Sequence, residues 1–357
     1  MNRRRLKKAI TRIANLPKNR DLFLYIRNKF RHVWLRLIKS TTVAYPSTIM
    51  LELTNHCNLR CTTCPREYNY GKQMDKGTMK VEQAKRIIDE LAPYLDSVGL
   101  TGMGETFLFR EIEEIAIYIK SKNKGIIISA STNAMLPDFP NIASRVIGTI
   151  DTIQISIDGL GDVYENIRLN ANFTQLDQNI RSLAEQCAGT KTTLMLNMVV
   201  TKENFRQMPR MVEYARDAGI RYLDFSIFNL AAVTEIPIDY YRFYQSEKFR
   251  GVLTDLERAV QKNPHVIVTN RKFNIENGFH KCPFPWTHFY ICWNGFVPPC
   301  CAKPFPKEMN FGNVFGDGCV LAVLNSPTYL AFRRRWFNNS APDFCNKCYY
   351  LEFKPIR

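Results

Sequence analysis

The sequence predicts an α/β fold, in which a partial barrel of six β/α units is followed by a small, loop-rich domain. Short runs rich in β-branched residues alternate with helical patterns from residue 47 to 236, which is typical of parallel strands joined by crossover helices. Residues 282–357 are instead rich in Cys, Pro, Gly and aromatic residues. Hydrophobic residues make up 45% of the 357 residues and charged residues 23%, which excludes a mostly disordered or collagen-like chain.

The strands and helices of the first region follow from hydrophobic periodicity. Six strands are predicted, at residues 48–53, 97–101, 125–130, 152–157, 193–200 and 222–228. Helices are predicted between them, at residues 81–95, 111–121, 175–187 and 205–218. The last helix is followed by Gly219, a residue type that commonly ends helices. Residues 237–281 are predicted to form a mainly helical connection.

The first forty residues carry most of the net charge. The chain has a formal net charge of +16, and residues 1–40 contribute 13 basic residues against Asp21 alone, a net of +12. Apolar residues recur at helical spacing from Leu22 to Ile38, so a basic amphipathic helix is predicted. It would either lie on an anionic membrane surface or pack on the protein with its charges in solvent. Nucleic acid is a weaker alternative, because no known nucleic-acid module accompanies the charge.

Neither a membrane-spanning helix nor a secretion signal is predicted. No stretch approaches the roughly 18–20 uninterrupted apolar residues that a span requires. Pro17, Lys18 and Asp21 interrupt the arginine-rich start before any long apolar core. Eleven cysteines in such a chain indicate metal ligation before disulfides. We therefore expect a cytoplasmic protein, at the inner face of the membrane if the basic helix binds lipid.

A group of three cysteines directly follows the first predicted strand. Cys57, Cys61 and Cys64 form a C-x3-C-x2-C pattern in a loop at the carboxyl end of that strand, where ligands face the mouth of a barrel. Three thiolates hold three irons of a [4Fe-4S] cluster and leave the fourth iron free for an external ligand. A structural zinc site is the alternative, but it needs a fourth ligand, and His56 beside Cys57 is sterically a poor choice.

The motif, its position and the predicted barrel resemble the radical S-adenosylmethionine (SAM) superfamily. The segment from Gly102 to Glu105 resembles the family's glycine-glycine-glutamate segment, although Met103 replaces a glycine. Thr106 also stands where proline is common, and Thr63 where an aromatic residue is usual. The resemblance assigns these residues to SAM binding: Gly102, Gly104, Glu105, Asn133, Ser156, Asp158 and Arg168.

A second group of four cysteines lies in the C-terminal region. Four thiolates fill every position of a cluster, which suits electron transfer or structural support. The spacing resembles the twitch type of the SPASM family of auxiliary-cluster domains, and is particularly similar to that of 2-deoxy-scyllo-inosamine dehydrogenase. A four-cysteine zinc site is the alternative. The four residues are Cys282, Cys300, Cys345 and Cys348.

The resemblance divides the chain into four parts. Residues 1–46 form the basic N-terminal segment, 47–236 the radical SAM partial barrel, 237–281 the helical connection and 282–357 the twitch or SPASM-like domain. The cofactors it implies are two [4Fe-4S] clusters and SAM, and the implied partner is a one-electron reductant such as flavodoxin or ferredoxin. In this chemistry, a reduced cluster cleaves SAM to a 5'-deoxyadenosyl radical, which abstracts hydrogen from the substrate.

Several reactions remain open at this point. The first hypothesis is a dehydrogenase that oxidises a carbinol of an anionic, carbohydrate-like or lipid-linked substrate to a ketone, with the auxiliary cluster as electron acceptor. The second is an epimerase in which Cys301 donates hydrogen. A peptide-modifying SPASM enzyme is less expected, because residues 1–46 are too short for the extra peptide-binding module. A non-catalytic zinc scaffold on membranes or RNA is the alternative from a different class.

Overall fold

The computed structural model describes residues 20–357 except 234, 270–272, 274, 278–281, 317, 339, 341, 349–352 and 356–357. The basic residues from Arg3 to Lys18 therefore lie outside the described part. The chain forms two compact units, each assembled from separate segments. Unit 1 comprises residues 1–56, 76–129 and 283–342, and unit 2 comprises residues 57–75, 130–282 and 343–357.

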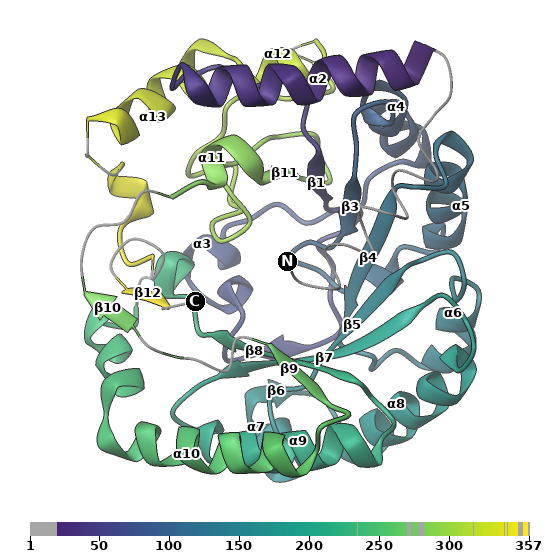
Figure 1. The fold of residues 1–357 in the computed structure, drawn as a ribbon, viewed down its shortest axis with the longest axis vertical. Helices are drawn as coiled ribbons and strands as arrows, with labels where there is room; N and C mark the ends of the chain where they lie inside the picture. Colours follow the sequence, from purple (N-terminus) through teal and green to yellow (C-terminus); the bar gives the residue numbers. More distant parts are fainter. Residues whose placement is uncertain are drawn as a thin grey trace. The chain divides into compact units, whose positions relative to one another are not determined.

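An open sheet of eight strands has the order β11-β1-β3-β4-β5-β7-β8-β9 (Figure 1). The first three strands belong to unit 1, the last four to unit 2, and β4 contributes residues to both. The bounds are β1 (Thr48–Leu51), β3 (Ser97–Leu100), β4 (Ile127–Thr132), β5 (Thr152–Ser156), β7 (Thr193–Val200), β8 (Tyr222–Ile227), β9 (Ile267–Thr269) and β11 (Phe289–Ile291). The predicted parallel α/β fold with a partial barrel is confirmed.

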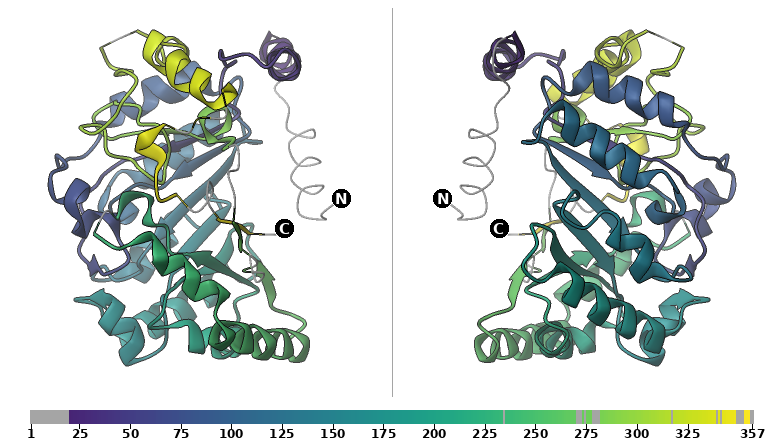
Figure 2. Two further views of the ribbon diagram at one scale, coloured as in Figure 1. Left: turned by 90° about the vertical axis from the view of Figure 1, so that its left-hand side faces the viewer. Right: turned by 90° about the vertical axis from the view of Figure 1, so that its right-hand side faces the viewer.

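In unit 1, the sheet is built around β1. It pairs in parallel with β3 on one side and β11 on the other, so that Ile49 lies opposite both Val98 and Phe289. Alternate residues of β1 are buried, as expected for a strand with one covered face. Helices α4 and α5 lie side by side (Figure 2). The helices of this unit are α2 (Arg20–Leu37), α4 (Val81–Leu91), η2 (Thr106–Leu108), α5 (Ile112–Lys122), α11 (Phe284–Thr287), α12 (Val320–Leu324) and α13 (Pro327–Phe337).

The C-terminal helices of unit 1 are joined by one buried cation. Arg333 is fully buried, and its guanidinium stacks 3.7 Å from the ring centre of Tyr329. It donates to the carbonyl oxygens of Pro285, Thr41 and Leu324 at 2.8, 3.1 and 2.7 Å. Burial lowers the pKa of Arg333 to about 10. A single side chain therefore ties α11, α12 and the segment before β1 to α13.

In unit 2, β7 lies at the centre of four parallel strands. Leu196 lies opposite Ile155 of β5 and Leu223 of β8, and all three side chains are fully buried. Helix α9 packs beside α10, and α6 beside α8. The helices are η1 (Pro65–Glu67), α3 (Asn69–Lys72), α6 (Phe139–Ser144), α7 (Asp162–Ile167), α8 (Phe173–Cys187), η3 (Phe205–Gln207), α9 (Met208–Asp217), η4 (Leu230–Ala232), η5 (Ile238–Gln245), α10 (Glu247–Lys262) and η6 (Asp343–Cys345).

Unit 2 also contains two short antiparallel pairs of strands. β2 (Arg60–Cys61) pairs with β6 (Arg168–Leu169), and β10 (Ile275–Asn277) pairs with β12 (Phe353–Pro355). The first pair fixes the three-cysteine loop against the strand that carries Arg168.

All six predicted strands are present as β1, β3, β4, β5, β7 and β8. Two strands of the sheet are not among these six: β9 comes from the connection expected to be mainly helical, and β11 from the region beyond residue 282. The basic amphipathic helix is confirmed as α2. Among the described helices, none is both long enough and apolar enough to cross a bilayer.

Candidate active site

The three-cysteine loop belongs to unit 2 and begins at Cys57, a short segment after the end of β1 at Leu51. The amide of Cys64 donates to the carbonyl of Cys61 at 3.0 Å, which closes a tight turn between the two thiols. The amide of Thr62 donates to the carbonyl of Ile167 at 2.9 Å. All three thiol-bearing residues of the loop, Cys57 included, are half-buried. The backbone therefore holds the thiols in one short, braced loop.

Arg168 connects this loop to the end of β5. Its side chain forms a buried ion pair with Asp158, with Nη2 2.9 Å and Nε 3.0 Å from Oδ2 of the carboxylate. Its Nη1 lies 3.8 Å from the Sγ of Cys61. The other carboxylate oxygen of Asp158 accepts from the amide of Val199 at 2.8 Å. Burial opposes the charge, but Asp158 and Cys61 hold the pKa of Arg168 above its ordinary value, so this guanidinium stays cationic beside the sulfur.

Asn133 lies beside Cys57 as Arg168 lies beside Cys61. Its amide nitrogen lies 3.7 Å from the Sγ of Cys57 and donates to the Oδ1 of Asn58 at 2.8 Å. Asn58 in turn donates to the carbonyl of Met135 at 3.0 Å, and the amide of Met135 donates to the Oδ1 of Asn133 at 2.8 Å. This reciprocal set of bonds locks the polar end of β4 onto the cysteine loop. Asn133 and Arg168 thus each present an N–H to a different thiol.

The donor set of the loop fits an iron–sulfur cluster. Burial raises the pKa of the Cys61 thiol to about 12 and raises that of Cys64 as well, so the thiolates need a cationic group to stabilise them. Iron supplies that charge, and N–H groups facing the sulfurs are typical of such sites. In the described part of the chain, no group of three or more His, Cys, Asp or Glu side chains is arranged to hold a single metal ion.

The glycine-rich segment after β3 belongs to unit 1 and packs on the backbone that leads into the cysteine loop. A Cβ on Gly104 would lie 2.4 Å from the carbonyl oxygen of His56 and 2.6 Å from that of Thr54. The amide of Glu105 donates to the carbonyl of His56 at 2.8 Å, and His56 directly precedes Cys57. The buried Glu105 side chain accepts from the amide of Phe107 at 3.1 Å and so caps η2.

A buried carboxylate that the sequence analysis missed supports this segment. Glu52, at the end of β1, accepts from the amide of Met103 at 2.8 Å and from the hydroxyl of Tyr290. A Cβ on Gly102 would lie 2.4 Å from the Cγ of Glu52, so this glycine makes room for the carboxylate. Burial and the neighbouring Glu52 raise the pKa of Tyr290 well above its ordinary value. Met103 stands where the family has a glycine, but its contact with Glu52 is made by the backbone amide, which either residue provides. A lone carboxylate in the apolar run 48–53 was the signal for this residue.

The remaining predicted SAM residue, Ser156, ends β5 opposite Asn197 of β7. Asn197 donates to Asp224 at 3.2 Å and to Ser226 at 2.9 Å, and Thr269 donates to the same aspartate. These residues share one face of the sheet in unit 2, while the opposite face carries buried apolar side chains such as those of β7 and β8. A polar, part-exposed surface therefore runs over four neighbouring strands.

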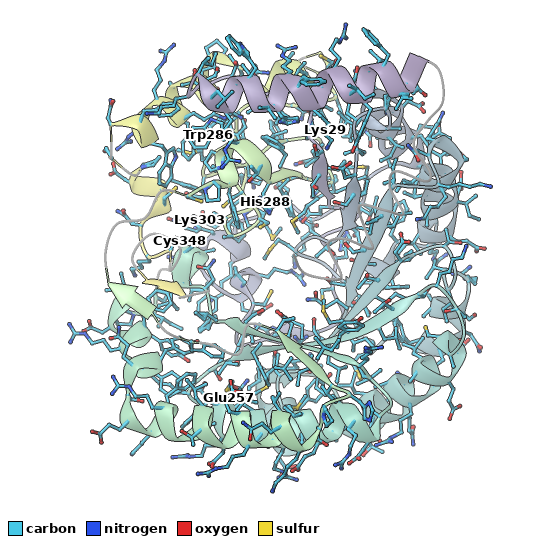
Figure 3. The ribbon with its side chains drawn as sticks, in the orientation of Figure 1. Lys29, Glu257, Trp286, His288, Lys303 and Cys348 are labelled. Carbon is cyan, nitrogen blue, oxygen red and sulfur yellow. The ribbon has the colours of Figure 1, made fainter. Side chains whose placement is uncertain are left out.

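The cysteines of the second group are distributed over both units. Cys282, Cys345 and Cys348 belong to unit 2, whereas Cys300 belongs to unit 1. The amide of Cys348 donates to the carbonyl of Cys345 at 3.3 Å, and Lys347 between them has a left-handed backbone with φ of 62°. The Lys347 carbonyl accepts from the hydroxyl of Tyr241 at 3.0 Å. Cys348 is labelled in Figure 3.

The other cysteines differ in exposure. Cys187 and Cys292 are buried, as predicted for small apolar side chains. Cys301 is half-buried beside Cys300, whose pKa is raised by burial. Cys319 is exposed and precedes α12.

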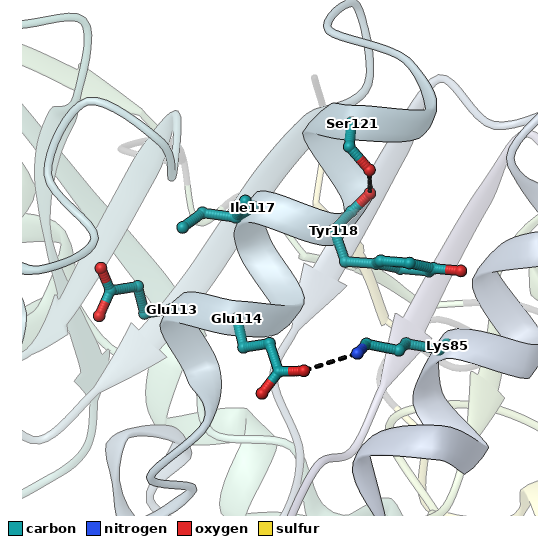
Figure 4. Close-up of a pocket in the computed structure, with 6 residues that line it drawn as sticks. All are labelled: Lys85, Glu113, Glu114, Ile117, Tyr118 and Ser121. Atoms are coloured by element: carbon teal, nitrogen blue, oxygen red, sulfur yellow. Dashed lines mark hydrogen bonds and ion pairs between the residues drawn. The ribbon is translucent and has the colours of Figure 1, made fainter.

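A hollow of about 380 Å³ lies on the outer surface of α4 and α5 and contains none of the predicted site residues (Figure 4). It is lined by Glu113, Ile117, Ser121 and the ring of Tyr118, and an ion pair of 2.6 Å between Lys85 and Glu114 crosses it. Both members of that pair are part-exposed, so the hollow is an open helix surface and not an enclosed ligand site.

Comparison with protein families agrees with this geometry. Residues 51–215 match the radical SAM superfamily, and residues 282–349 match the SPASM iron–sulfur cluster-binding domain. The first match contains the three-cysteine loop and every residue that we assigned to SAM; the second contains all four cysteines of the second group. The protein therefore combines a radical SAM domain with a SPASM domain, and this combination implies SAM and two [4Fe-4S] clusters as cofactors.

Individual proteins similar to this chain are named for different functions. A tungsten-containing aldehyde ferredoxin oxidoreductase cofactor-modifying protein of Pyrococcus furiosus is 22% identical over 84% of this chain and 86% of its own length. The antilisterial bacteriocin subtilosin biosynthesis protein AlbA of Bacillus subtilis is 23% identical, over 94% of this chain and 71% of its own length.

Solved structures share the fold. SuiB of Streptococcus suis, bound to the precursor peptide SuiA, superposes with a TM-score of 0.64 at 17% identity, over 89% of this chain and 73% of its own. BtrN, in complex with SAM (AdoMet) and 2-DOIA, superposes with a TM-score of 0.52 at 13% identity, over 86% of this chain and 94% of its own. At this identity the likeness concerns the fold alone, so the particular similarity to 2-deoxy-scyllo-inosamine dehydrogenase is not confirmed.

Proposed function

We propose that the protein is a radical SAM enzyme that modifies a peptide. The observation that carries this proposal is the similarity, over most of the chain, to a bacteriocin biosynthesis protein and to a structure solved with a precursor peptide bound. This reverses the order of our sequence-based hypotheses, in which a carbohydrate-like or lipid-linked substrate came first. That order depended on the small size of residues 1–46, which says nothing about the surface of the sheet itself.

The first cluster site is proposed at Cys57, Cys61 and Cys64. These three thiolates would leave the fourth iron of the cluster without a protein ligand and so open to SAM. When bound, a reduced cluster of this kind supplies the electron that cleaves SAM to methionine and a 5'-deoxyadenosyl radical, which takes hydrogen from the substrate. Asn133 and Arg168 donate toward two of the sulfurs at 3.7 and 3.8 Å. Such N–H groups stabilise negative charge on the sulfurs and so favour the ligated state.

The remaining residues assigned to SAM are proposed to act by binding. Glu105 is a buried carboxylate, and its position is fixed by the hydrogen bond that its backbone amide donates to the carbonyl of His56. We assign it to the amino group of SAM. Gly102 and Gly104 let their segment pack closely on Glu52 and on the backbone of residues 54–56. Ser156, the last residue of β5, and Asp158, just after it, are assigned to the ribose side of the SAM site. Arg168 is assigned to the SAM carboxylate, for which it keeps a cationic guanidinium.

The polar sheet surface around Asn197, Asp224 and Ser226 is the proposed substrate-binding surface. It offers amide, carboxylate and hydroxyl groups from neighbouring strands, which suit the backbone and polar side chains of a peptide. The second cluster is proposed at Cys282, Cys300, Cys345 and Cys348, where four thiolates leave no open iron and favour electron transfer. A flavodoxin or ferredoxin is the proposed reductant.

A second candidate is oxidation of a carbinol in a carbohydrate-like or lipid-linked anionic substrate. The same acceptors and donors at Asn197, Asp224 and Ser226 suit sugar hydroxyls, which is the observation in its favour. A variant of this candidate is epimerisation with Cys301 as hydrogen donor. A Cys301→Ala protein that forms epimer at the wild-type rate would remove that variant.

The test uses anaerobically reconstituted protein with a chemical reductant and SAM. We expect 5'-deoxyadenosine by mass spectrometry, faster formation when substrate peptides are added than when glycosides are added, and deuterium transfer from labelled peptide into 5'-deoxyadenosine. A Cys57→Ala protein is the negative control. If glycosides accelerate the reaction and peptides do not, the peptide proposal is wrong and the dehydrogenase candidate replaces it.

A further inference from the structure

Helix α2 presents its apolar side to solvent. Seven large apolar residues on α2 and the residue after it are exposed, and most of them recur three or four residues apart, which places them on one face of the helix. Figure 2 shows α2, in purple, at the margin of unit 1. Their exposed fractions are Phe23 63%, Ile26 44%, Phe30 71%, Val33 58%, Trp34 61%, Leu37 71% and Ile38 51%.

The polar side of α2 is the side that packs on unit 1. Tyr25 donates to Asp96 at 2.6 Å, and Lys29, labelled in Figure 3, donates to the other oxygen of that carboxylate at 2.5 Å. Asn28 is buried and donates to the carbonyl of Tyr45 at 2.9 Å, while the amide of Tyr45 donates back to Asn28 at 3.1 Å. Specific polar bonds thus fix the rotation of the helix, with its apolar side outward.

This orientation is the reverse of that in a surface helix of an ordinary globular protein, whose apolar stripe faces the core. Packing on the protein with the charges in solvent was expected to turn the apolar side toward the protein, and α2 has the opposite orientation. The other sequence-based interpretation, a helix on an anionic membrane surface, requires the apolar side to face outward and stays a prediction. An exposed apolar stripe of this size marks an interaction surface. The stripe also contains Trp34 and two phenylalanines, and aromatic residues are favoured at the boundary between lipid headgroups and acyl chains.

Cationic side chains border the stripe. Arg27 and Arg31 are exposed on its edge, and the guanidinium of Arg27 lies 5.7 Å from the ring centre of Phe23. The sequence of residues 1–40 has a net charge of +12. Basic residues beside an apolar stripe complement the negative surface of an anionic bilayer. They disfavour pairing of two copies through this face, because the same arginines would meet across a symmetric interface.

We propose that α2 docks the protein on an anionic lipid surface, with the apolar stripe in the boundary between headgroups and acyl chains and the arginines among the headgroups. The polar bonds to Asp96 and Tyr45 hold the rest of unit 1 on the other side of the helix. This inference does not depend on the proposed reaction, because it uses residues that take no part in cluster, SAM or substrate binding.

The first test is flotation of the full chain with vesicles of phosphatidylcholine, with and without phosphatidylglycerol. We expect flotation with the anionic vesicles only, and its loss as salt concentration rises. Trp34→Glu is expected to lower partitioning by about tenfold or more, because it removes one aromatic anchor and adds a like charge. Ile117→Glu is the matched control: it replaces another exposed apolar side chain, on α5, and is expected to float like the wild type.

The second test separates charge from apolar contact. Arg27→Gln combined with Arg31→Gln is expected to weaken binding to anionic vesicles several-fold. The matched control is Arg210→Gln combined with Arg250→Gln, which removes the same charge from exposed positions on α9 and α10. Far-UV circular dichroism confirms that each variant remains folded, as expected for exposed positions.

Three outcomes would overturn the proposal. The first is equal, negligible flotation of all proteins. The second is flotation that Trp34→Glu and Ile117→Glu reduce alike, because binding would then not depend on α2. The third is self-association, measured by sedimentation, that Trp34→Glu abolishes while no protein binds vesicles; the face would then be an interface between copies.

Discussion

Arg168 and Asp158 form a buried ion pair, and the guanidinium that makes it also faces the sulfur of Cys61 at 3.8 Å. The aspartate is fully buried and receives a further bond from the amide of Val199. One carboxylate therefore orients the cation that lies beside the cysteine loop. Because both charges are out of water, each depends on the other for its stability.

Replacing Asp158 by Asn should destabilise the protein strongly. The change leaves Arg168 buried without its counter-charge, which typically costs about 3–5 kcal/mol. We expect the thermal unfolding midpoint to fall by about 5–10 °C, measured anaerobically by scanning fluorimetry. The matched control is Asp255→Asn, which breaks the exposed Arg258–Asp255 pair of 2.8 Å and should change the midpoint little. Equal effects of the two changes would contradict the structural role of the buried pair.

Replacing Gly104 by Ala should impair loading of the first cluster. A Cβ at this position meets backbone atoms of His56 and Thr54 at 2.4 and 2.6 Å, and backbone cannot move aside as a flexible side chain can. The displaced segment leads directly into Cys57. We expect the reconstituted protein to retain about four of roughly eight irons, measured by iron and sulfide analysis. Gly251→Ala is the control, because no atom lies within 4 Å of its added Cβ; iron loss there too would contradict this explanation.

The two cysteine groups should differ in what their loss does. Cys57→Ala and Cys345→Ala are each expected to lower the iron content by about four atoms per chain. Only Cys57→Ala should abolish cleavage of SAM, because only the first cluster is proposed to have an open iron. The measurements are iron analysis and the yield of 5'-deoxyadenosine. Two results would contradict the assignment: zinc in place of iron in the purified protein, or SAM cleavage that persists in both variants.

Replacing Tyr290 by Phe should weaken the support of the glycine-rich segment. The change removes the hydroxyl that donates to the buried carboxylate of Glu52, and a hydrogen bond to a charged group contributes about 1.5–3 kcal/mol. Glu52 also contacts Gly102 and the amide of Met103, so we expect SAM to bind several-fold more weakly by equilibrium dialysis. Tyr118→Phe, which removes an exposed bond to Asp89 at 2.7 Å, is the control and should leave SAM binding unchanged.

The sequence predicted the parts of the fold that rest on local periodicity. Strands of four or more residues show the burial alternation that defines them, and all six were found. The three-residue strands β9 and β11 are too short to show a period. The three-cysteine motif is local and was therefore visible. The bond between Glu52 and Tyr290 joins residues 238 positions apart, and the exposed face of α2 depends on polar bonds to Asp96; neither is encoded in a local pattern.

Acidification should loosen the packing of α2 through His32. This side chain contacts the carbonyl of Tyr45 at 2.8 Å, and its pKa is lowered from 6.5, chiefly by burial and also by the charge of Lys29. Arg31 lowers the pKa further, whereas the Tyr45 carbonyl and Asp96 oppose the shift. The unfolded state therefore binds the proton before the folded state does as pH falls. The stability contributed by neutral His32 is complete above pH 6.5 and is lost as pH falls through the lowered folded-state value.

His32→Gln isolates this contribution, because glutamine donates to a carbonyl at every pH and cannot gain a charge here. We expect the thermal midpoint of the wild type to fall more steeply below pH 6.5 than that of His32→Gln. The control is His265→Gln, at an exposed position, which should follow the wild type. Parallel curves for the wild type and His32→Gln would show that protonation of this ring has no bearing on how α2 is held.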